Sequence, residues 1–163
     1  MSKDCPAETS KQSECSPSTV ANSETLLYVL IEPHNYEASG ISARAFSKTE
    51  LRNSQVSVSR KNHTPREVLQ NEVIDVLRKK DPRRKFRGVL QAKCHEVRKL
   101  KTEIPDNKRA FCVVDDGTPK NIGHAHLGFS HTAKQQTKSE WTAYRENLTL
   151  LFGEERSLNE IYV

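Results

Sequence analysis

The chain has 163 residues, a mean hydropathy of −0.75 and a formal net charge of +5, with 34% hydrophobic and 29% charged residues. A chain of this length supports one domain whose core needs no metal or disulfide. No segment has the length and apolar character of a membrane span, and the N-terminus lacks the apolar run of a signal peptide. The sequence therefore predicts a soluble, cytoplasmic protein.

Residues 1–24 are expected to form a flexible, acidic, Ser-rich tail. The segment contains almost no large apolar side chain. Such a composition cannot bury enough surface to offset the entropy lost on ordering. We therefore predict a tail at residues 1–24 and a single domain at residues 25–163.

The four cysteines show no metal-binding or disulfide pattern. Cys5 and Cys15 stand in the predicted tail, Cys94 and Cys112 in the domain, and no Cys-x-x-Cys pair occurs. The spacing indicates neither a disulfide framework nor a four-sulfur zinc site. Cys94 and Cys112 are expected to act as small buried hydrophobes.

The first ordered elements are two strands separated by a short helical stretch. Residues 25–32 form a nearly continuous apolar run that ends at Pro33, which is typical of a buried central strand. Residues 41–51 favour one or two helical turns, and residues 55–60 alternate between polar and apolar as in a half-buried strand.

A helix is predicted to follow, from Thr64 to Lys80. Thr64 as N-cap, Pro65 at the first helical position and Glu67 match a capping box. Asp81-Pro82 should end the helix. Its predicted apolar face consists of Leu69, Val73, Val76 and Leu77.

The second half of the chain predicts three more strands and one more helix. Strands are expected at residues 88–97, 110–114 and 122–130, with a turn at residues 115–119. A capping box at Thr137 and Glu140 opens a helix that Gly153 should end. The last ten residues are expected to dock on the domain.

These elements favour an α+β fold with a mostly antiparallel sheet of about five strands and two main helices. The strands cluster in pairs instead of alternating with helices, which argues against a doubly wound sheet. The connections between the last strands are too short for crossover helices, so neighbouring strands should run antiparallel.

His124 and His126 are the most informative pair in the chain. In a strand at residues 122–130, Ala125, Leu127 and Phe129 should face the core and leave both histidines on the opposite face. Together with His34 they are candidate catalytic groups for acid–base or phosphoryl-transfer chemistry, because a histidine exchanges protons near neutral pH. Ordinary surface histidines would show the same pattern.

A metal ion is a further reading of the His124/His126 pair. His131 or the Asp115-Asp116 pair could supply a third ligand, but the spacing fixes none of them. We therefore assign no metal and no cofactor from the sequence.

The positive charge is concentrated in one stretch. Between Arg78 and Arg109, 13 Lys and Arg residues stand against four acidic residues. Such clustering favours a polyanionic partner, and Phe86 would offer a ring for stacking on a base. The candidate nucleic-acid-binding residues are Arg78, Lys79, Lys80, Arg83, Arg84, Lys85, Phe86, Arg87, Lys93, Arg98, Lys99 and Lys101.

Several short motifs resemble a group of small, uncharacterised bacterial proteins. These are the Leu27–Pro33 strand, Gly40-Ile41-Ser42 with Ala45-Phe46, the Val56–Arg60 strand and Asn121-x-x-His124-Ala-His126-Leu-Gly128. The resemblance implies a bacterial origin. A fainter one is to ADP-ribosyltransferase-like folds, which also open with a Leu-Tyr strand. The chain departs from these folds because its first strand lacks an arginine or histidine.

The leading functional prediction is a small accessory or binding module that contacts nucleic acid, DNA or RNA, within a bacterial multi-protein assembly. The first alternative is an enzyme that processes a phosphate or nucleotide group on the His124/His126 face. The second is a subunit that binds another protein. No membrane partner is expected.

Overall fold

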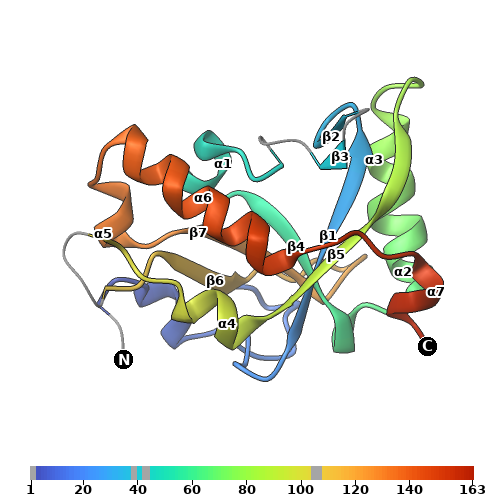
Figure 1. Ribbon diagram of the computed structural model, residues 1–163. Coiled ribbons are helices and arrows are strands. Elements are labelled where there is room, and N and C mark those ends of the chain that lie inside the picture. Colours follow the sequence, from blue (N-terminus) through green and yellow to red (C-terminus); the bar gives the residue numbers. More distant parts are fainter. Residues whose placement is uncertain (1–2, 38–39, 42–44, 104–107) are drawn as a thin grey trace.

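A five-stranded antiparallel sheet lies at the centre of the computed structural model, which describes residues 3–37, 40–41, 45–103 and 108–163 (Figure 1). The strand order is β5-β1-β4-β7-β6. The strands are β1 (Thr25–Glu32), β4 (Val56–Arg60), β5 (Lys85–Lys93), β6 (Phe111–Asp115) and β7 (His124–Phe129), and β2 (Tyr36–Glu37) and β3 (Gly40–Ile41) form a separate pair. This architecture confirms the predicted α+β fold with an antiparallel sheet.

The longest helix is α6 (Lys138–Phe152), and the others are short. They are α1 (Lys48–Arg52), α2 (Arg66–Val68), α3 (Asp75–Lys79), α4 (Cys94–Lys99), α5 (His131–Lys134) and α7 (Leu158–Ile161), with 3-10 turns η1 (Pro6–Thr9) and η2 (Lys61–His63) and the π-helical η3 (Leu69–Ile74). Among the described residues, no helix is long and apolar enough to cross a bilayer. The helical turns predicted at residues 41–51 correspond to α1, and residues 42–44 lie outside the described residues.

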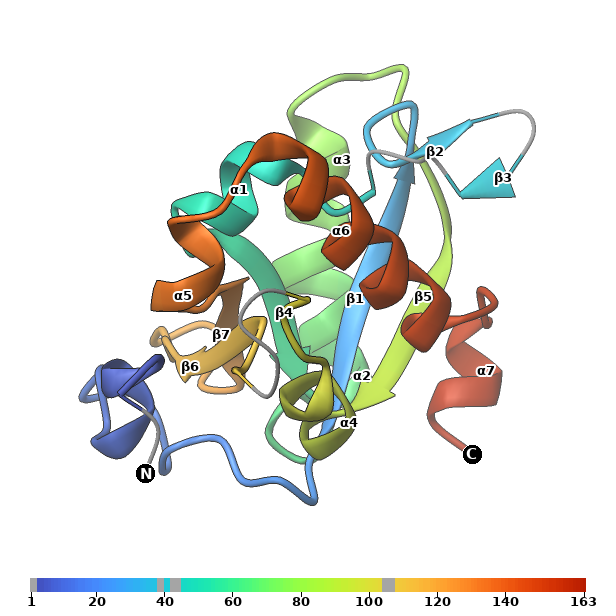
Figure 2. The same ribbon diagram turned by 60° about the vertical axis from the view of Figure 1, so that its left-hand side comes forward.

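Strand β1 is buried on both faces, as its continuous apolar run predicts. Successive side chains of a strand point to opposite sides of the sheet. Leu26, Tyr28 and Leu30 enter the larger core, whereas Leu27 and the alternate residues after it enter a smaller one. Figure 2 shows α6 on one face of the sheet and α2 and α3 on the other, and each face carries one of the two cores.

The larger core lies beneath α6. This core contains Trp141, Tyr144, Leu148 and Phe152 of the helix, and Trp141 and Tyr144 contact the ring of Phe129 on the sheet. Both capping-box bonds between Thr137 and Glu140 are present, and Gly153 with φ 72° ends the helix. Because a positive φ suits glycine, the predicted stop at this position is confirmed.

The smaller core is covered by a continuous helical segment, α2 to α3, and by α7. Leu69 and Ile74 of the segment and Ile161 of α7 pack on Leu27 and Val29 of β1. The predicted capping box at Thr64 is wrong, because the buried Thr64 hydroxyl donates to Asn121 Oδ1 at 3.0 Å and no side chain caps the helix. Val76 is also not a core residue, since 43% of it is exposed.

Helices cover only part of this second face. The smaller core involves β1 and β5, and its members include no residue of β4 or β7. Along β4 and β7 the same face carries Ser57 and Ser59 opposite His126 and His124. A polar surface of the sheet therefore borders the helical segment that covers β1.

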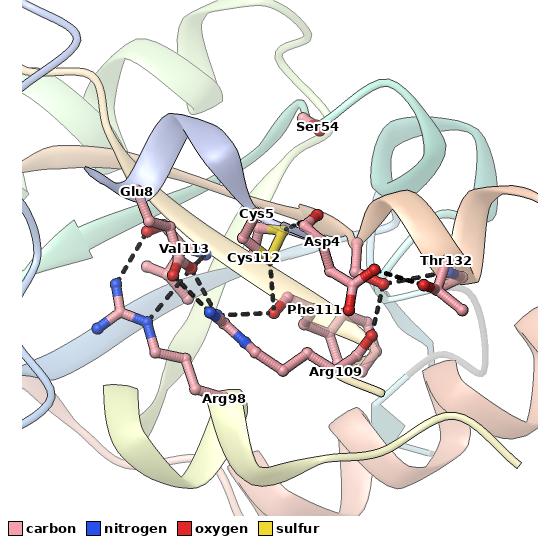
Figure 3. The surroundings of a disulfide bond; sticks show 12 residues. Asp4, Cys5, Glu8, Ser54, Arg98, Arg109, Phe111, Cys112, Val113 and Thr132 are labelled. Carbon is pink, nitrogen blue, oxygen red and sulfur yellow. Dashed lines mark hydrogen bonds and ion pairs between the residues drawn. A yellow bond between two sulfur atoms is a disulfide. The ribbon is translucent and has the colours of Figure 1, made fainter. Parts of the chain in front are cut away.

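The N-terminal residues 3–24 are attached to the domain and do not form the predicted flexible tail. A disulfide links Cys5 to Cys112 of the edge strand β6 (Figure 3). This bond also corrects the prediction that the chain has no disulfide and that Cys112 is a free buried residue. Cys94 is free and fully buried, as predicted.

Polar contacts hold the rest of this segment. The Glu8 carboxylate accepts the Val113 N–H at 2.8 Å and pairs with Arg98 and Arg109 (Figure 3). Further along, Glu24 pairs with the fully buried Arg60 at 2.7 Å. The composition of residues 1–24 indicates only how much apolar surface they can bury, and ion pairs and a disulfide anchor the segment without such burial.

Candidate functional site

His124 and His126 lie where the alternation of β7 predicts. Ala125 and Leu127 enter the larger core, and the two imidazoles project from the opposite face with 21% and 31% of their side chains exposed. The ring centroids are 5.0 Å apart and the rings are nearly perpendicular. The two side chains are therefore neighbours that solvent can reach.

Asp116 joins the two histidines into one cluster. Its Oδ2 lies 3.1 Å from His124 Nδ1 and 3.2 Å from His126 Nε2. The main chain fixes its place, because Asp116 N–H donates to the His124 carbonyl at 3.0 Å and His124 Nδ1 also lies 3.0 Å from the Asp116 carbonyl. Asp116, His124 and His126 form the cluster that we call the Asp-His-His cluster.

The other sequence candidates for a third partner lie elsewhere. The buried Asp115 carboxylate accepts the N–H groups of Gln12 and Ser13. His131 opens α5, and its ring lies against Gln135. The sequence could not decide between Asp115 and Asp116, because the choice depends on where β6 ends.

The His126 ring favours its neutral form. Burial lowers its pKa, the nearby Asp116 carboxylate raises it, and His124 lowers it again, so that the pKa lies below that of an ordinary histidine. A neutral imidazole carries a free lone pair at neutral pH. His126 is therefore able to accept a proton or to ligate a cation.

A cleft of about 530 Å³ opens beside this cluster. One wall is apolar and comes from Val73, Val76 and Leu77 of the helical segment. The polar lining residues Ser57, Ser59, Asn121 and His124 come from the sheet and from the loop before β7, and Leu27 and Val29 of β1 also line the cleft. This volume is within the range of small-molecule sites, about 300–1,000 Å³.

Charged residues surround the cleft. Lys80, Arg84 and Lys120 line it together with two carboxylates, Glu50 and Glu72. The predicted catalytic residue His34 also lines it, so the structure brings His34 and His124 to one cleft although 90 positions separate them. His126 is not among the lining residues and lies beside the cleft, in contact with His124.

The buried Asn121 positions the loop that contains Lys120 and leads into β7. Asn121 Oδ1 accepts the Thr64 hydroxyl at 3.0 Å and the Gly123 N–H at 3.1 Å. A side chain at Gly123 would come within 2.2 Å of Thr64 Oγ1. The small residue thus permits close approach of main chain to main chain, and the loop is fixed against the start of the helical segment.

The predicted basic stretch does not form one stripe. Strand β5 separates its two parts, with Lys85 at one end and Lys93 at the other (Figure 1). Eight steps of about 3.3 Å put them roughly 27 Å apart. One group of cations, residues 78–87, therefore lies near α3, and the second, from Lys93 to Arg109, lies around α4.

Carboxylates neutralise part of both groups. Arg83 pairs with Asp81, Arg87 with Glu32, Lys99 with Glu96, and Arg98 and Arg109 share Glu8. Phe86 packs against the smaller core, which leaves its ring partly buried. Four further exposed members of the first group, Arg78, Lys79, Lys80 and Lys85, have no carboxylate partner among the ion pairs of the described residues.

Comparison with known proteins gives no match to a protein-family model, to a curated protein or to a solved structure.

Proposed function

We propose that the protein binds a phosphate-bearing ligand of nucleotide size in the cleft and processes its phosphate group with His124. The observation that supports this proposal most is that apolar side chains, polar side chains that include an imidazole, and three cations line one cleft. A nucleotide likewise combines a flat, weakly polar base with an anionic phosphate.

Each group of lining residues has a role in this proposal. Val73, Val76 and Leu77 accept the base, because burial of apolar surface is favourable. Lys80, Arg84 and Lys120 bind phosphate oxygens through charge-assisted hydrogen bonds. The Arg84 Nη1 donates to the Leu77 carbonyl at 2.9 Å, which orients its guanidinium beside the apolar wall.

The chemical role falls to the histidines. His124 reaches the cleft and is held by Asp116, the arrangement in which a carboxylate orients an imidazole for proton transfer. A positioned general acid or base contributes typically about 10²–10⁴-fold to a rate. His34, which also lines the cleft, is the second candidate for proton transfer.

Fluorescent ADP and bis(p-nitrophenyl) phosphate test the two halves of this proposal. Lys80→Ala and Lys120→Ala should each weaken binding of labelled ADP about tenfold, or roughly 1.4 kcal/mol. His124→Ala should retain binding and lower phosphodiester hydrolysis about 100-fold. Lys99→Ala, which changes a cation at the other end of β5, is the matched control. Equal binding by all four proteins would reject the cleft as the ligand site.

A second candidate function is contact with nucleic acid through the residues that begin at Arg78. The exposed positive charges of Arg78, Lys79, Lys80 and Lys85 favour contact with a polyanion. Two cations of this region, Lys80 and Arg84, also line the cleft. Charge reversal of Arg78, Lys79 and Lys85 to Glu should abolish salt-sensitive binding of single-stranded RNA or DNA at low salt. The same reversal at Lys93, Lys99 and Lys101 is the control. Undiminished binding after the first reversal would exclude this surface.

Association with a bacterial assembly, a protein partner and a cytoplasmic location stay predictions. The Cys5–Cys112 bond supplies a test of the location, because disulfides are rare in reducing compartments. Mass spectrometry of protein trapped with alkylating reagent in host cells would find Cys5 and Cys112 alkylated in a reducing cytoplasm. A bonded pair would argue for an oxidising compartment.

A further inference from the structure

The Asp-His-His cluster has the composition and spacing of a metal site. It offers two imidazole nitrogens and one carboxylate oxygen, and all three ligand atoms lie within 4.8 Å of one another. Three protein ligands of this kind, with a further position left open, are typical of catalytic zinc sites and of related first-row metals. The Cys5, Glu8 and Cys112 group also lies close together, but its two sulfur atoms form the disulfide.

The two distances from the Asp116 carboxylate to the imidazole nitrogens fit an ion shared by this carboxylate and both rings. Bonds of about 2.0–2.1 Å to a tetrahedral ion hold the ligand atoms roughly 3.3–3.4 Å apart. Asp116 Oδ2 lies 3.1 and 3.2 Å from the two imidazole nitrogens. The carboxylate is therefore already at the distance from both rings that a shared ion requires.

The surroundings leave one side of the cluster open. The side chains of His124, His126 and Asp116 are 21%, 31% and 43% exposed, so water or a ligand can reach an ion held between them. The main chain supports the arrangement, since β7 fixes both histidines on one face and Asp116 N–H bonds to the His124 carbonyl. These contacts place two of the three ligands on a rigid strand.

We propose that Asp116, His124 and His126 bind one divalent first-row transition-metal ion of the zinc class. Binding of the ion needs none of the cleft residues except His124. Its use in the cleft rests on the ligand-binding half of the proposed function and replaces proton transfer by His124, because a ligating imidazole no longer accepts a proton and the divalent cation instead polarises a phosphate oxygen that the cleft cations have positioned. The competing arrangement is a metal-free cluster in which the two rings donate hydrogen bonds to Asp116.

Titration of the full chain with Co²⁺ alone tests the site. We expect one ion per chain, a visible absorption spectrum of low coordination number, and displacement by Zn²⁺. Asp116→Ala and His126→Ala should each weaken Co²⁺ binding by at least about 100-fold, the upper end of the loss caused by outer-shell partners. His95→Ala is the matched control, since His95 lies 2.7 Å from Glu96 and, among the described residues, belongs to no group of three possible ligands.

A second measurement uses the unchanged chain and does not depend on the folding of variants. Co²⁺ should broaden backbone NMR signals first around residues 114–118 and 124–126. Broadening centred elsewhere, or no saturable binding, would overturn the metal site. The Co²⁺ titration contains no nucleotide, so its result does not depend on the ADP titration. Either proposal, the ligand cleft or the metal site, can therefore be rejected without the other.

Discussion

At the scale of single residues, Gly123 is the position where the candidate site tolerates least change. A Cβ there would meet Thr64 Oγ1 at 2.2 Å and the His63 carbonyl at 2.9 Å. Gly123→Ala should therefore destabilise the protein by about 1–3 kcal/mol, as overpacking does. Urea unfolding measures this loss. Ile122→Ala, at a neighbour that is 44% exposed, should change stability by less than about 0.5 kcal/mol. An equal loss in both variants would contradict the close contact.

Residue-scale prediction from the sequence succeeds where a local pattern decides. The outward position of His124 and His126 follows from the alternation of β7 alone. The choice of Asp116 as their partner does not follow from a local pattern. Asp115 and Asp116 are adjacent and point to opposite sides, and the position at which β6 ends decides which of them reaches the histidines. Thr64 likewise fits a capping box, yet its hydroxyl donates a hydrogen bond to Asn121, 57 positions away.

At the scale of elements, one buried ion pair joins the N-terminal segment to the end of β4. Burial raises the pKa of Glu24, but hydrogen bonds from Arg60 and from the Ala21 N–H, with the nearby charges, bring it below its ordinary value. A carboxylate with a lowered folded-state pKa stabilises the fold above the unfolded pKa, about 4.3. This stabilisation is lost as the pH falls through the folded-state pKa.

Glu24→Gln should remove this pH dependence and leave Arg60 as a buried, unpaired charge. The expected loss at neutral pH is about 3–5 kcal/mol. Urea unfolding at several pH values checks both statements: the original protein should lose stability on acidification below about pH 4.3, and the variant should lose less. Glu154→Gln changes an exposed carboxylate and is the control. Parallel curves for the original protein and Glu24→Gln would show that the pair does not titrate as described.

The sequence predicts an element correctly where a regular apolar or capping pattern marks it, and incorrectly where the helix geometry departs from the regular repeat. The bounds of β1 and the caps of α6 follow from an apolar run and from Thr137, Glu140 and Gly153. The helix predicted from Thr64 to Lys80 corresponds to the segment α2 to α3. Its π-helical middle, η3, shifts the side chains after Leu69, so that Val76 faces the cleft instead of the core. Helical periodicity assumes 3.6 residues per turn throughout, which a π segment breaks.

At the scale of the whole molecule, the fold class was predictable because short connections favour antiparallel neighbours. The cleft was not, since it depends on how far the helical segment extends across one face of the sheet. His34 and His124 meet there only because the loop after β1 and the start of β7 border the same uncovered surface. Nor does any pattern in residues 5–13 indicate that they lie along β6, because their partners Arg109, Cys112, Val113 and Asp115 are more than 100 positions away in the sequence.

The attachment of residues 3–24 gives the last prediction. Cys112→Ser removes a bond that closes a loop across 107 positions, and loss of such a bond typically costs about 2–4 kcal/mol. Under oxidising conditions this variant should unfold at lower urea, and trypsin should cut more rapidly after the exposed Lys11. The domain should stay folded in this variant, because the ion pairs of Glu8 with Arg98 and Arg109 still hold the N-terminal segment against it. Cys15→Ser removes a free thiol and should match the unchanged protein in both measurements. If the two variants behave alike, residues 3–24 are held to the domain by their polar contacts and the disulfide adds nothing to that hold.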